Sequence, residues 1–547
     1  MNGRKEYERW LEQAGDAEIQ AELRSMDEAA VEDAFYRDLA FGTGGLRGII
    51  GAGTNRMNIY VVAKASQGLA GFLGAGASVV IGYDSRMKSD VFARAAAGVF
   101  AANGILVHFW PRLMPVPTVS FAVRELKASA GVMITASHNP ARYNGYKVYG
   151  PDGCQITTET AASVLSRISS LDIFSDVKRM GFEEAVAEGR VRYIDDAVLT
   201  SYIGAVRSQS VLFGDETDRD VAVVYTPLNG TGLVPVTRVL REAGFHRVEV
   251  VEEQRLPDGS FPTCPSPNPE IREAMALGLA YCRRLNADLL LATDPDADRC
   301  GIAVRDGEEY RLLTGNEVGL LLLDFICSQR TKHQAMPPHP VFIKTIVTTD
   351  LAEKIAARYG VRTINVLTGF KFIGEVIGRM EDERNFICGF EESYGYLTGS
   401  YVRDKDGVTA AFMICEMFAF DRTRGISLPD RLKEIYAACG YCLNTLHSYE
   451  FPGSAGMEKM GAIMKAFHEG PDTIGGEKAE KTEDYLPGLN GLPPSDVLKF
   501  FIPSGSVVIR PSGTEPKLKI YISVTAENRP SAEQAERRIA ADLESRL

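Results

Sequence analysis

A pattern of apolar strands that each end in a polar loop repeats three times along this 547-residue chain and restricts the folds it can adopt. Each unit reads as strand, helix-like stretch, second strand, helix-like stretch and third strand. The strand segments are expected at 78–86, 104–110, 131–140, 221–232, 247–251, 287–299, 340–350, 361–367 and 385–396. Because crossovers between parallel strands are right-handed, the three final loops should lie at equivalent sheet edges and converge on one cleft.

The predicted fold class is therefore α/β, with three similar α/β domains that contain mixed, mainly parallel sheets. From about Tyr441 the chain changes character, with a Gly- and charge-rich stretch followed by two further strands and a helix, which predicts a smaller C-terminal α+β domain beside the central cleft. Residues 4–38 are expected to form one or two amphipathic helices. The expected domains are 1–207, 208–325, 326–440 and 441–547.

Charge and composition limit the partners of the protein. The net charge of -12 and the isoelectric point near 5.3 argue against nucleic acid or an anionic membrane. An anionic substrate must then be held by a local cluster of cations. No apolar stretch approaches the about 18 residues of a membrane helix, and the N-terminus lacks a signal-peptide core, so a cytoplasmic location is expected. The sequence specifies no oligomeric state.

Cysteine usage points to the same compartment. The nine cysteines are scattered, which is typical of a reducing environment. Cys439 and Cys442 form a C-x-x-C pair, but the pair follows a helix-like run instead of opening a helix after a strand. We therefore expect neither a redox nor a zinc role.

The stretch GVMITASHNPARYNGYKVYG at 131–150 reads as a buried strand that presents Ser137 at its C-terminal end. His138 and Asn139 flank this serine, and a second turn brings Lys147 back toward it. The same residues also occur in ordinary turns, so a structural role stays open on this stretch alone. A hydrolase is disfavoured because no G-x-S-x-G elbow is present.

Three carboxylates at alternate positions, Asp294, Asp296 and Asp298, follow the strand at 289–291. Carboxylates that lie so close together repel one another unless a hard divalent cation lies among them. The spacing therefore predicts a magnesium-type oxygen site. An EF-hand is excluded, since Arg299 and Arg305 occupy the positions that require Gly and Glu. A phosphatase with an aspartate nucleophile and a solvated acidic turn remain alternatives.

Two further loops carry candidate binding residues. GFEESYG at 389–395 supplies adjacent carboxylate and hydroxyl acceptors that suit sugar hydroxyls, and TGFK at 368–371 and RDKDG at 403–407 add cations to the same rim. RPSGTEPK at 510–517 has the composition of a phosphate cradle. A surface turn and a hairpin turn, respectively, are the plain alternatives.

TASHNP followed by YNGYK resembles the phosphoserine loop of the α-D-phosphohexomutases, the phosphoglucomutase/phosphomannomutase superfamily. The phosphoserine, metal, sugar and phosphate loops of that family all occur here in the family's order, across nearly the whole chain. The segments FGTGGLRG and NRMN look most like the branch of bacterial phosphoglucomutases and glucose/pentose mutases, whose N-terminal arginine is matched by Arg47.

The resemblance implies an intramolecular phosphotransferase that interconverts glucose 1-phosphate and glucose 6-phosphate through a phosphoserine enzyme and a sugar bisphosphate. Mg²⁺ is the implied cofactor and a sugar 1,6-bisphosphate the implied activator, with small phosphosugars as partners. Phosphopentomutase, phosphomannomutase and a magnesium-dependent phosphatase are alternatives. Turnover of the bisphosphate without escape requires an enclosed site, so the C-terminal domain should close over the ligand.

Residue pattern and resemblance together predict the following roles: catalytic, Ser137, His138, Lys147, Arg47 and Arg299; metal-binding, Ser137, Asp294, Asp296 and Asp298; sugar-binding, Thr368, Gly369, Lys371, Glu391, Ser393 and Lys405; phosphate-binding, Arg510, Ser512, Gly513, Thr514 and Lys517. One departure is visible, because many members carry glycine where this chain has Ala297. The difference matters only if the backbone there needs a positive φ.

Overall fold

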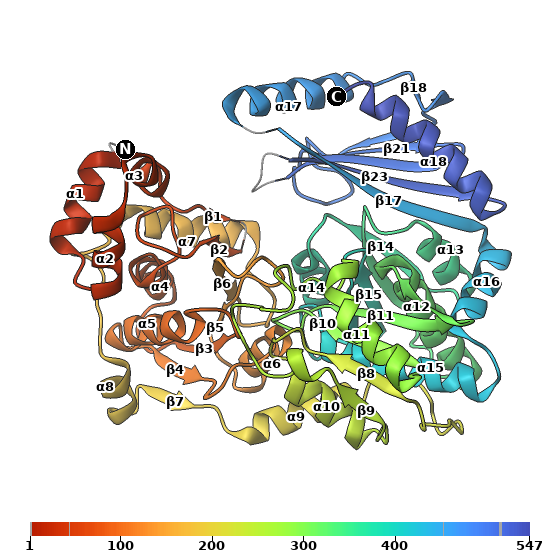
Figure 1. The fold of residues 1–547 in the computed structure, drawn as a ribbon, viewed down its shortest axis with the longest axis horizontal. Coiled ribbons are helices and arrows are strands. Elements are labelled where there is room, and N and C mark those ends of the chain that lie inside the picture. Colours follow the sequence, from red (N-terminus) through yellow and green to blue (C-terminus); the bar gives the residue numbers. More distant parts are fainter. Residues whose placement is uncertain (1–2, 43, 452, 513–516) are drawn as a thin grey trace.

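The structure, a computed structural model, describes residues 3–42, 44–451, 453–512 and 517–547. Four sheet-bearing units follow one another along this described part of the chain, and the last of them lies above the third in the view of Figure 1. The predicted α/β class, with three similar units and a smaller C-terminal one, is confirmed. The exact domain bounds stay a prediction.

The first unit is built on a mixed sheet with the strand order β1-β2-β6-β5-β3-β4-β7. Its parallel part is β5-β3-β4-β7, and β6, β2 and β1 add to it in antiparallel fashion. The strands are β1 Phe41–Gly42, β2 Gly45–Ile49, β3 Ser78–Tyr83, β4 Leu106–Phe109, β5 Ala130–Ile134, β6 Tyr143–Tyr149 and β7 Val191–Tyr193. The helices are α4 Ile59–Leu73, α5 Ser89–Ala102, α6 Val116–Glu125, α7 Thr158–Ser170, α8 Phe182–Ala187 and α9 Asp196–Arg207.

The second and third sheets repeat this arrangement, with the orders β12-β11-β10-β8-β9 and β14-β13-β15-β16. Their strands are β8 Val223–Thr226, β9 Val248–Val250, β10 Leu289–Thr293, β11 Cys300–Asp306, β12 Glu309–Leu313, β13 Val341–Thr345, β14 Arg362–Val366, β15 Phe386–Glu391 and β16 Gly395–Thr398. Their helices are α10 Leu233–Glu242, η1 Glu252–Gln254, α11 Arg272–Leu285, α12 Gly315–Lys332, α13 Leu351–Arg358, α14 Phe370–Arg379, η2 Glu383–Asn385, α15 Gly407–Thr423 and α16 Leu428–Cys439.

The predicted strands keep one spatial order in all three units, with the first strand between the third and the second. The third strand, β5, β10 or β15, then turns back into an antiparallel neighbour, β6, β11 or β16. These returning strands are not among the strand segments expected from the pattern. Their presence makes each charged loop a strand-to-strand turn at the same sheet edge.

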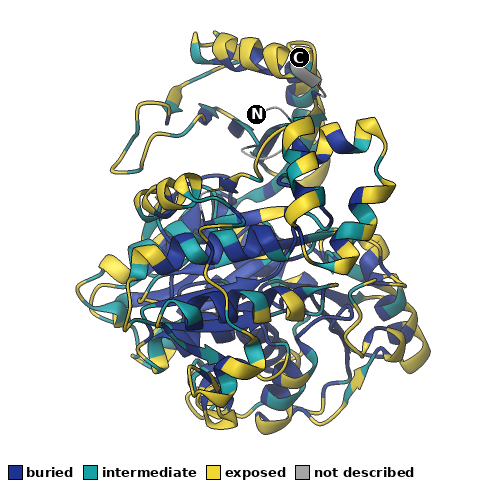
Figure 2. Ribbon diagram, turned by 90° about the vertical axis from the view of Figure 1, so that its left-hand side faces the viewer, coloured by how far each residue is buried: buried dark blue, intermediate teal, exposed yellow. Residues whose placement is uncertain are grey.

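A continuous hydrophobic core joins the three α/β units. It contains residues from all three sheets, such as Met133, Leu291 and Ile343, each of which is fully buried. Figure 2 shows the buried residues concentrated on the sheets and the exposed ones on the outer faces of the helices. The loops of the three units are therefore held on one packed body.

Within residues 3–42, three N-terminal helices form instead of the one or two expected: α1 Gly3–Gln13, α2 Ala17–Ser25 and α3 Glu28–Phe35. The carboxylate of Asp16 accepts the backbone N–H groups of the first turn of α2, and that of Asp27 does the same for α3. Both residues act as N-caps, which divides the amphipathic run into shorter helices. Trp10 anchors them, because it is fully buried and packs edge-on against Phe35 and Tyr60.

The fourth unit has an antiparallel sheet of order β17-β23-β22-β21-β20 and a separate core around residues such as Phe500 and Ile520. Its elements are β17 Tyr441–Glu450, α17 Gly453–His468, β18 Thr473–Ile474, β19 Glu477–Lys478, β20 Lys481–Asp484, β21 Leu498–Ile502, β22 Gly505–Pro511, β23 Lys517–Ala526 and α18 Arg529–Glu544. Cys439 ends α16 and Cys442 lies in β17, and both are free thiols.

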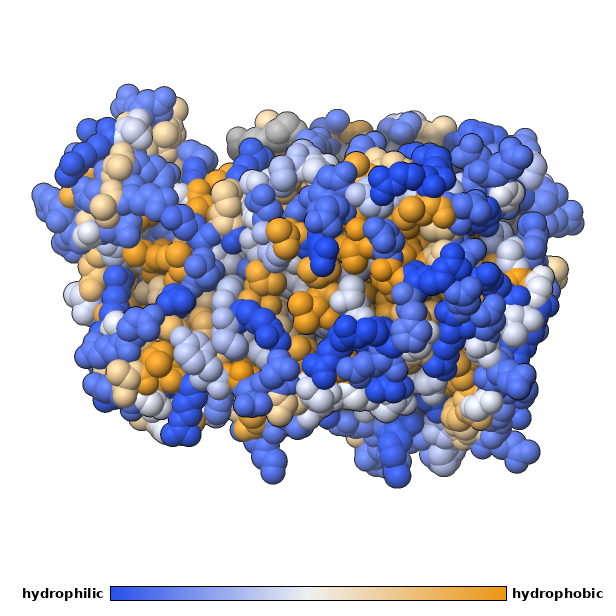
Figure 3. All heavy atoms as spheres, turned by 60° about the horizontal axis from the view of Figure 1, so that its bottom comes forward, coloured by the Kyte–Doolittle hydropathy of each residue, from blue (hydrophilic) through white to orange (hydrophobic). Residues whose placement is uncertain are grey.

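On the face shown in Figure 3, hydrophilic residues protrude and hydrophobic ones lie in recesses between them. Among the described residues, every helix is too short or too polar to cross a membrane.

Candidate active site

A cavity of about 800 Å³ lies where loops of all four units meet. Its wall includes Ser137 from the first unit, Arg299 from the second, Glu391 from the third and Arg510 from the fourth. This volume is in the range of sites for small molecules. The three charged loops thus converge as expected from the repeated pattern.

Ser137 occupies the turn that follows β5 and is almost completely buried. Its hydroxyl Oγ lies 2.9 Å from Asp294 Oδ2 and 3.1 Å from His138 Nδ1. The backbone N–H of Ser137 donates to Thr135 Oγ1, which in turn donates to Asp296 Oδ2. Ser137 has a φ of 53°, a left-handed conformation that costs a non-glycine residue about 1–3 kcal/mol.

Asp294, Asp296 and Asp298 directly follow β10, and each offers a carboxylate oxygen within 4.8 Å of the others. All three side chains are buried. Asp296 Oδ1 and Asp298 Oδ1 have no hydrogen-bond donor among the described residues. Three buried carboxylates with oxygens this close together, two of which keep an oxygen without a donor, match the ligand set of a hard divalent cation, so the triad fits a metal ion.

Ala297, between two of these aspartates, has a φ of 49°. The condition under which this departure from the family pattern matters is therefore met. An alanine here holds a left-handed conformation that glycine adopts without strain.

Cationic side chains surround the triad. Lys147 Nζ lies 3.0 Å from Asp296 Oδ2 and 3.4 Å from Asp298 Oδ2, and Lys405 Nζ lies 3.2 Å from the same atom of Asp298. Arg299 pairs with Glu270 and has its Nε 3.9 Å from Asp298 Oδ1. Lys405, expected at the sugar rim, is thus also a partner of the metal-type triad.

Arg47 reaches the same region from β2. In the β2–β6 register, Arg47 pairs with Gly145, and Gly45 pairs with Lys147. The Arg47 guanidinium donates to Asn139 Oδ1 at 3.2 Å, in the loop that carries Ser137. The returning strand β6 therefore places two of the predicted catalytic cations beside the serine.

Burial and neighbouring charges shift the proton affinities of this cluster. Burial, reinforced by the charges of Asp296 and Asp298, raises the pKa of Asp294 well above its usual range. For Asp298 burial acts in the same direction, but the ammonium groups of Lys405 and Lys147 outweigh it and lower the pKa. Burial, together with Arg299 and Arg47, lowers the pKa of His138 well below 6.5, so its imidazole is neutral near pH 7.

The loop after β15 forms the sugar side of the predicted site. Glu391 is buried, and its Oε1 accepts the backbone N–H of Gly369 at 3.1 Å. Burial raises the pKa of Glu391 to about 7, with Lys405 opposing the shift. Thr368 and Ser393 also line the cavity. Lys371 is not among the residues that line it, and its carbonyl accepts a hydrogen bond from the Cys154 thiol.

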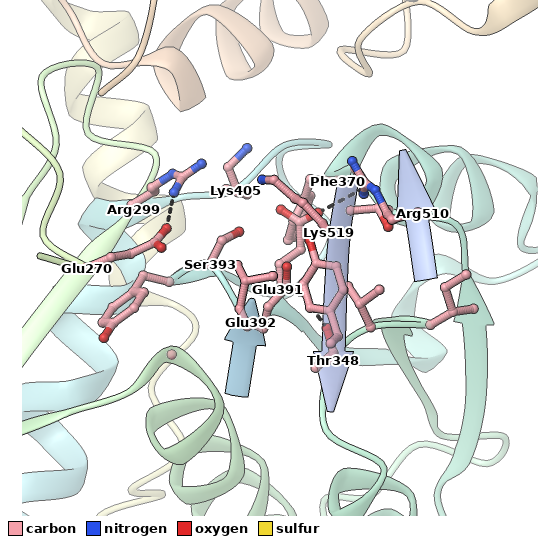
Figure 4. A pocket seen from close by; sticks show the side chains of 18 of the residues that line it. Glu270, Arg299, Thr348, Phe370, Glu391, Glu392, Ser393, Lys405, Arg510 and Lys519 are labelled. Carbon is pink, nitrogen blue, oxygen red and sulfur yellow. Dashed lines mark hydrogen bonds and ion pairs between the residues drawn. The ribbon is translucent and has the colours of Figure 1, made fainter. Parts of the chain in front are cut away.

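The fourth unit contributes cations at the far end. Figure 4 shows Arg299, paired with Glu270, at one end of the cavity and Arg510 at the other. Arg510 lies opposite Lys519 in the β22–β23 register, so their side chains share one face of the sheet. Ser512 and Lys517 lie beyond the lining, where Lys517 pairs with Glu450 at 3.2 Å. Gly513 and Thr514 fall outside the described residues.

A buried ionic contact joins the third and fourth units at the cavity wall. Asp350 Oδ1 lies 2.7 Å from Lys499 Nζ and 3.1 Å from Lys344 Nζ, and its Oδ2 accepts from Ser506 Oγ at 2.7 Å. Lys344 belongs to β13, whereas Lys499 and Ser506 belong to β21 and β22. Both lysine side chains are almost completely buried.

Sequence reasoning missed several of these lining residues: Glu270, Lys519, Asp350 and Lys499. Lys519 was detectable in principle, because it occupies a position that faces Arg510 once the hairpin register is known. Glu270 and Lys499 carry no local signal, since each meets its partner only through the packing of distant segments, and of the partners of Asp350 only Lys344 is near it in the sequence.

Sequence models of the phosphoglucomutase/phosphomannomutase family match this chain over most of its length. The models for its alpha/beta/alpha domains I, II and III match residues 38–173, 200–307 and 314–439, and the model for its C-terminal domain matches residues 455–541. This chain belongs to that family. Within the family, a phosphoglucomutase of Staphylococcus saprophyticus is 36% identical over 537 residues, which cover 95% of this chain and 96% of the relative. One of Staphylococcus aureus is 35% identical over 541 residues, with the same coverage.

Solved structures share the fold. A Paramecium phosphoglucomutase, described as an open form, superposes with a TM-score of 0.69 at 18% identity and covers 94% of both chains. An Aspergillus fumigatus N-acetylphosphoglucosamine mutase, solved with GlcNAc-6P and magnesium, has a TM-score of 0.52 at 14% identity, covering 93% of this chain and 96% of that one. The predicted membership in the phosphohexomutase superfamily, and its bacterial phosphoglucomutase branch, is confirmed.

Proposed function

We propose that this protein is a phosphoglucomutase that interconverts glucose 1-phosphate and glucose 6-phosphate through a phosphoserine at Ser137 and a bound glucose 1,6-bisphosphate. The observation that carries the proposal is the position of Ser137 Oγ, 2.9 Å from Asp294, at the wall of a cavity that Asp298 and a distant arginine, Arg510, also line. Relatives named phosphoglucomutase that align over 95% of the chain support it.

We propose Mg²⁺ as the metal, held by Asp294, Asp296 and Asp298 together with the phosphorylated Ser137. The all-oxygen ligand set favours a hard cation over zinc, which prefers nitrogen and sulfur ligands. When bound, the ion neutralises charge on the transferring phosphoryl group. Metal binding also requires an ionised Asp294, so it should release the proton that burial favours on this carboxyl.

The protein's own residues would position and neutralise the phosphoryl group. Phosphoryl transfer depends more on in-line placement and charge compensation than on new covalent chemistry. Lys147 and Arg299 supply positive charge beside the carboxylates, and Arg47 supplies it beside the serine loop. The phosphorus–Oγ bond of Ser137 breaks as a bond forms from phosphorus to the oxygen of the free sugar hydroxyl, and the proton of that hydroxyl passes overall to Ser137 Oγ. The reverse step at the opposite phosphate restores the phosphoserine.

The other end of the cavity would hold the sugar and the non-reacting phosphate. We assign the sugar hydroxyls to Glu391 and Ser393, and the distal phosphate to Arg510 with Ser512, Gly513, Thr514 and Lys517. Cations at both ends suit a substrate with two phosphates. A bisphosphate that turns over inside the cavity exchanges its two ends, so a free sugar 1,6-bisphosphate should prime the unphosphorylated enzyme.

We also propose a cytoplasmic location and small phosphosugars as the partners. All nine cysteines lie in the described part of the chain as free thiols, which fits a reducing cytoplasm. The acidic net charge fits a small phosphosugar as ligand, with neither nucleic acid nor a membrane as partner.

The experiment is a kcat/KM panel over glucose, mannose, ribose, deoxyribose and N-acetylglucosamine 1-phosphates with Mg²⁺, with and without the bisphosphate. Free phosphate is measured in parallel. We expect glucose 1-phosphate to give the highest kcat/KM with negligible phosphate release. A tenfold preference for ribose 1-phosphate would overturn the assignment of glucose as the substrate. Dominant release of free phosphate would show that the protein is a phosphatase and not a mutase.

A further inference from the structure

Arg86 lies between β3 and α5, outside every loop assigned a role above, and its side chain is fully buried. A guanidinium is almost never buried without partners, because it loses strong hydration. Its partners therefore reveal what the burial achieves.

The guanidinium donates to four backbone carbonyls of one short segment. Nη1 donates to the carbonyl oxygens of Pro140 and Tyr143 at 3.0 and 3.1 Å. Nη2 donates to the carbonyl oxygens of Ser137 and Asn139. Three acceptors lie in the loop that begins with the serine and the fourth is Tyr143, the first residue of β6, so one side chain ties the whole loop to the end of β3.

Arg86 is itself held from two sides. Asp84 Oδ2 lies 3.4 Å from its Nε, and Asp84 Oδ1 accepts from Ser89 Oγ at 2.6 Å and from the Arg86 backbone N–H at 2.9 Å. The ring of Phe261, from the second unit, lies 5.1 Å from the guanidinium carbon. Near Phe261, a Cβ on Gly259 would lie 2.7 Å from the Arg86 carbonyl carbon, so the second unit packs tightly on the backbone at Arg86.

Ser137 needs such support, because its left-handed φ of 53° is strained for a residue with a side chain. A strained conformation persists only where the surroundings over-determine it. The Thr135 hydroxyl fixes the N–H of Ser137, and Arg86 fixes its carbonyl. Both flanks of the serine are thus held while its Oγ faces Asp294.

We propose that Arg86 is a positioning residue that keeps Ser137 Oγ aimed at the metal-binding carboxylates, by holding the carbonyls of the 137–143 segment against the end of β3. Arg86 is not among the residues that line the cavity. The planar fork of arginine offers five donors, whereas the lysine ammonium offers three around a point. This inference rests on the proposed phosphoryl transfer through Ser137.

The test compares Arg86→Ala and Arg86→Lys with the parent. For Arg86→Ala we expect kcat to fall about 100-fold, because displacement of a reacting group by about 1 Å costs that much. KM for glucose 1-phosphate should change less than about threefold, since the sugar and distal phosphate contact other units. Arg86→Lys should recover about tenfold of the loss, and free guanidinium should partly rescue Arg86→Ala.

The matched control is Arg94→Ala. Arg94 lies on α5, pairs with Glu183 and has half of its side chain exposed, so its loss should leave kcat unchanged. Each kcat is normalised to the fraction of molecules phosphorylated at Ser137, measured by intact mass after treatment with bisphosphate. This removes any contribution from unfolded protein, and Arg86→Lys decides the matter if Arg86→Ala does not fold.

Hydrogen exchange in the absence of substrate gives a readout independent of activity. We expect faster exchange of the backbone amides in residues 137–147 of Arg86→Lys and unchanged exchange in Arg94→Ala. A normalised kcat of Arg86→Lys within about twofold of the parent, or unchanged exchange in that segment, overturns the inference. A parent inactive on every phosphosugar overturns the proposed function instead, and the exchange result still decides the role of Arg86.

Discussion

The first three units and the fourth differ in how they are joined. One hydrophobic core runs through the three α/β units, whereas the fourth has its own core. The fourth meets the third through a small apolar cluster, which includes Ile346 and Tyr521, through Cys442 of β17, which packs in the shared core, and through the Asp350 contact. The serine and the aspartates thus share one body, and the distal arginine stands on another. If the proposed roles hold, the chemistry that needs fixed geometry lies on the units with the shared core, and the distal phosphate is bound by the separately attached unit.

The largest effect is expected at the centre of the shared body. Ser137→Ala should lower kcat by about 10,000-fold or more, because no other group can carry the phosphoryl. Peptide mass analysis should also lose the phosphorylated species, while the unfolding temperature stays close to that of the parent. Persistent activity in this variant would show that Ser137 does not carry the phosphoryl group.

Asp296→Asn should lower kcat by about 1,000-fold, because it removes a charge from the metal-binding carboxylates and a partner of Lys147. KM should change little, since the affected atoms lie on the reacting side. Steady-state kinetics over a magnesium titration measures both. The control is Asp306→Asn at the end of β11, beyond the cavity lining, and full activity after exhaustive chelation would contradict the metal assignment.

Arg510→Ala tests the other body. We expect a loss of about 2–4 kcal/mol in kcat/KM, with a clear rise in KM, because an arginine–phosphate contact in a closed cavity is charge-assisted and desolvated. Arg537→Ala, on the exposed side of α18, is the matched control in the same unit. A change within threefold, under about 0.7 kcal/mol, would assign the distal phosphate elsewhere.

Asp350→Asn tests the junction itself. We expect the free energy of unfolding to fall by about 1.5–3 kcal/mol, because the buried ammonium groups of Lys344 and Lys499 lose the carboxylate that pairs with both. Burial opposes ionisation of Asp350, but these two ammonium groups lower its pKa. A lowered pKa stabilises the fold above the unfolded value of about 3.8, so the difference from the parent should shrink as pH falls below it. Urea unfolding at several pH values measures this, and a constant difference would contradict it.

The smallest effect concerns Glu391. Burial raises the pKa of Glu391 to about 7, so its carboxylate should gain a proton as pH falls. If sugar binding needs the ionised carboxylate, kcat/KM should decline from about pH 8 to 6. Glu391→Gln should flatten this slope. Because the folded pKa exceeds the unfolded one, the parent should also lose about 1 kcal/mol of stability or more as pH rises from about 4.5 to 7, and the variant should not.

Local pattern predicted the repeated strands and their charged loops, because a buried strand and its turn are contiguous in sequence. It did not predict the returning strand β6, which carries Lys147 beside Arg47, or strand β17, whose pairing depends on β23. It also missed Glu270, whose partner Arg299 lies on another segment, and Asp350, whose partners Lys499 and Ser506 do as well. The left-handed backbone at Ala297 is not indicated by the residue itself, since alanine gives no sign of a positive φ, and only the glycine of many family members pointed to it.

The Asp350 contact holds strand β22 to the third unit at Ser506, close to Arg510. Ser506, which it holds, and Arg510 lie on the same face of β22, four residues apart, or about 13 Å along an extended strand. A tilt of the strand by about 10° at Ser506 would therefore move Arg510 by about 2 Å. A displacement of that size would break a hydrogen bond between the Arg510 guanidinium and a bound phosphate. A small rotation of the fourth unit about this contact would thus change the distance from Arg510 to Ser137, while Ser137 and the aspartates would keep their positions relative to one another on the three joined units.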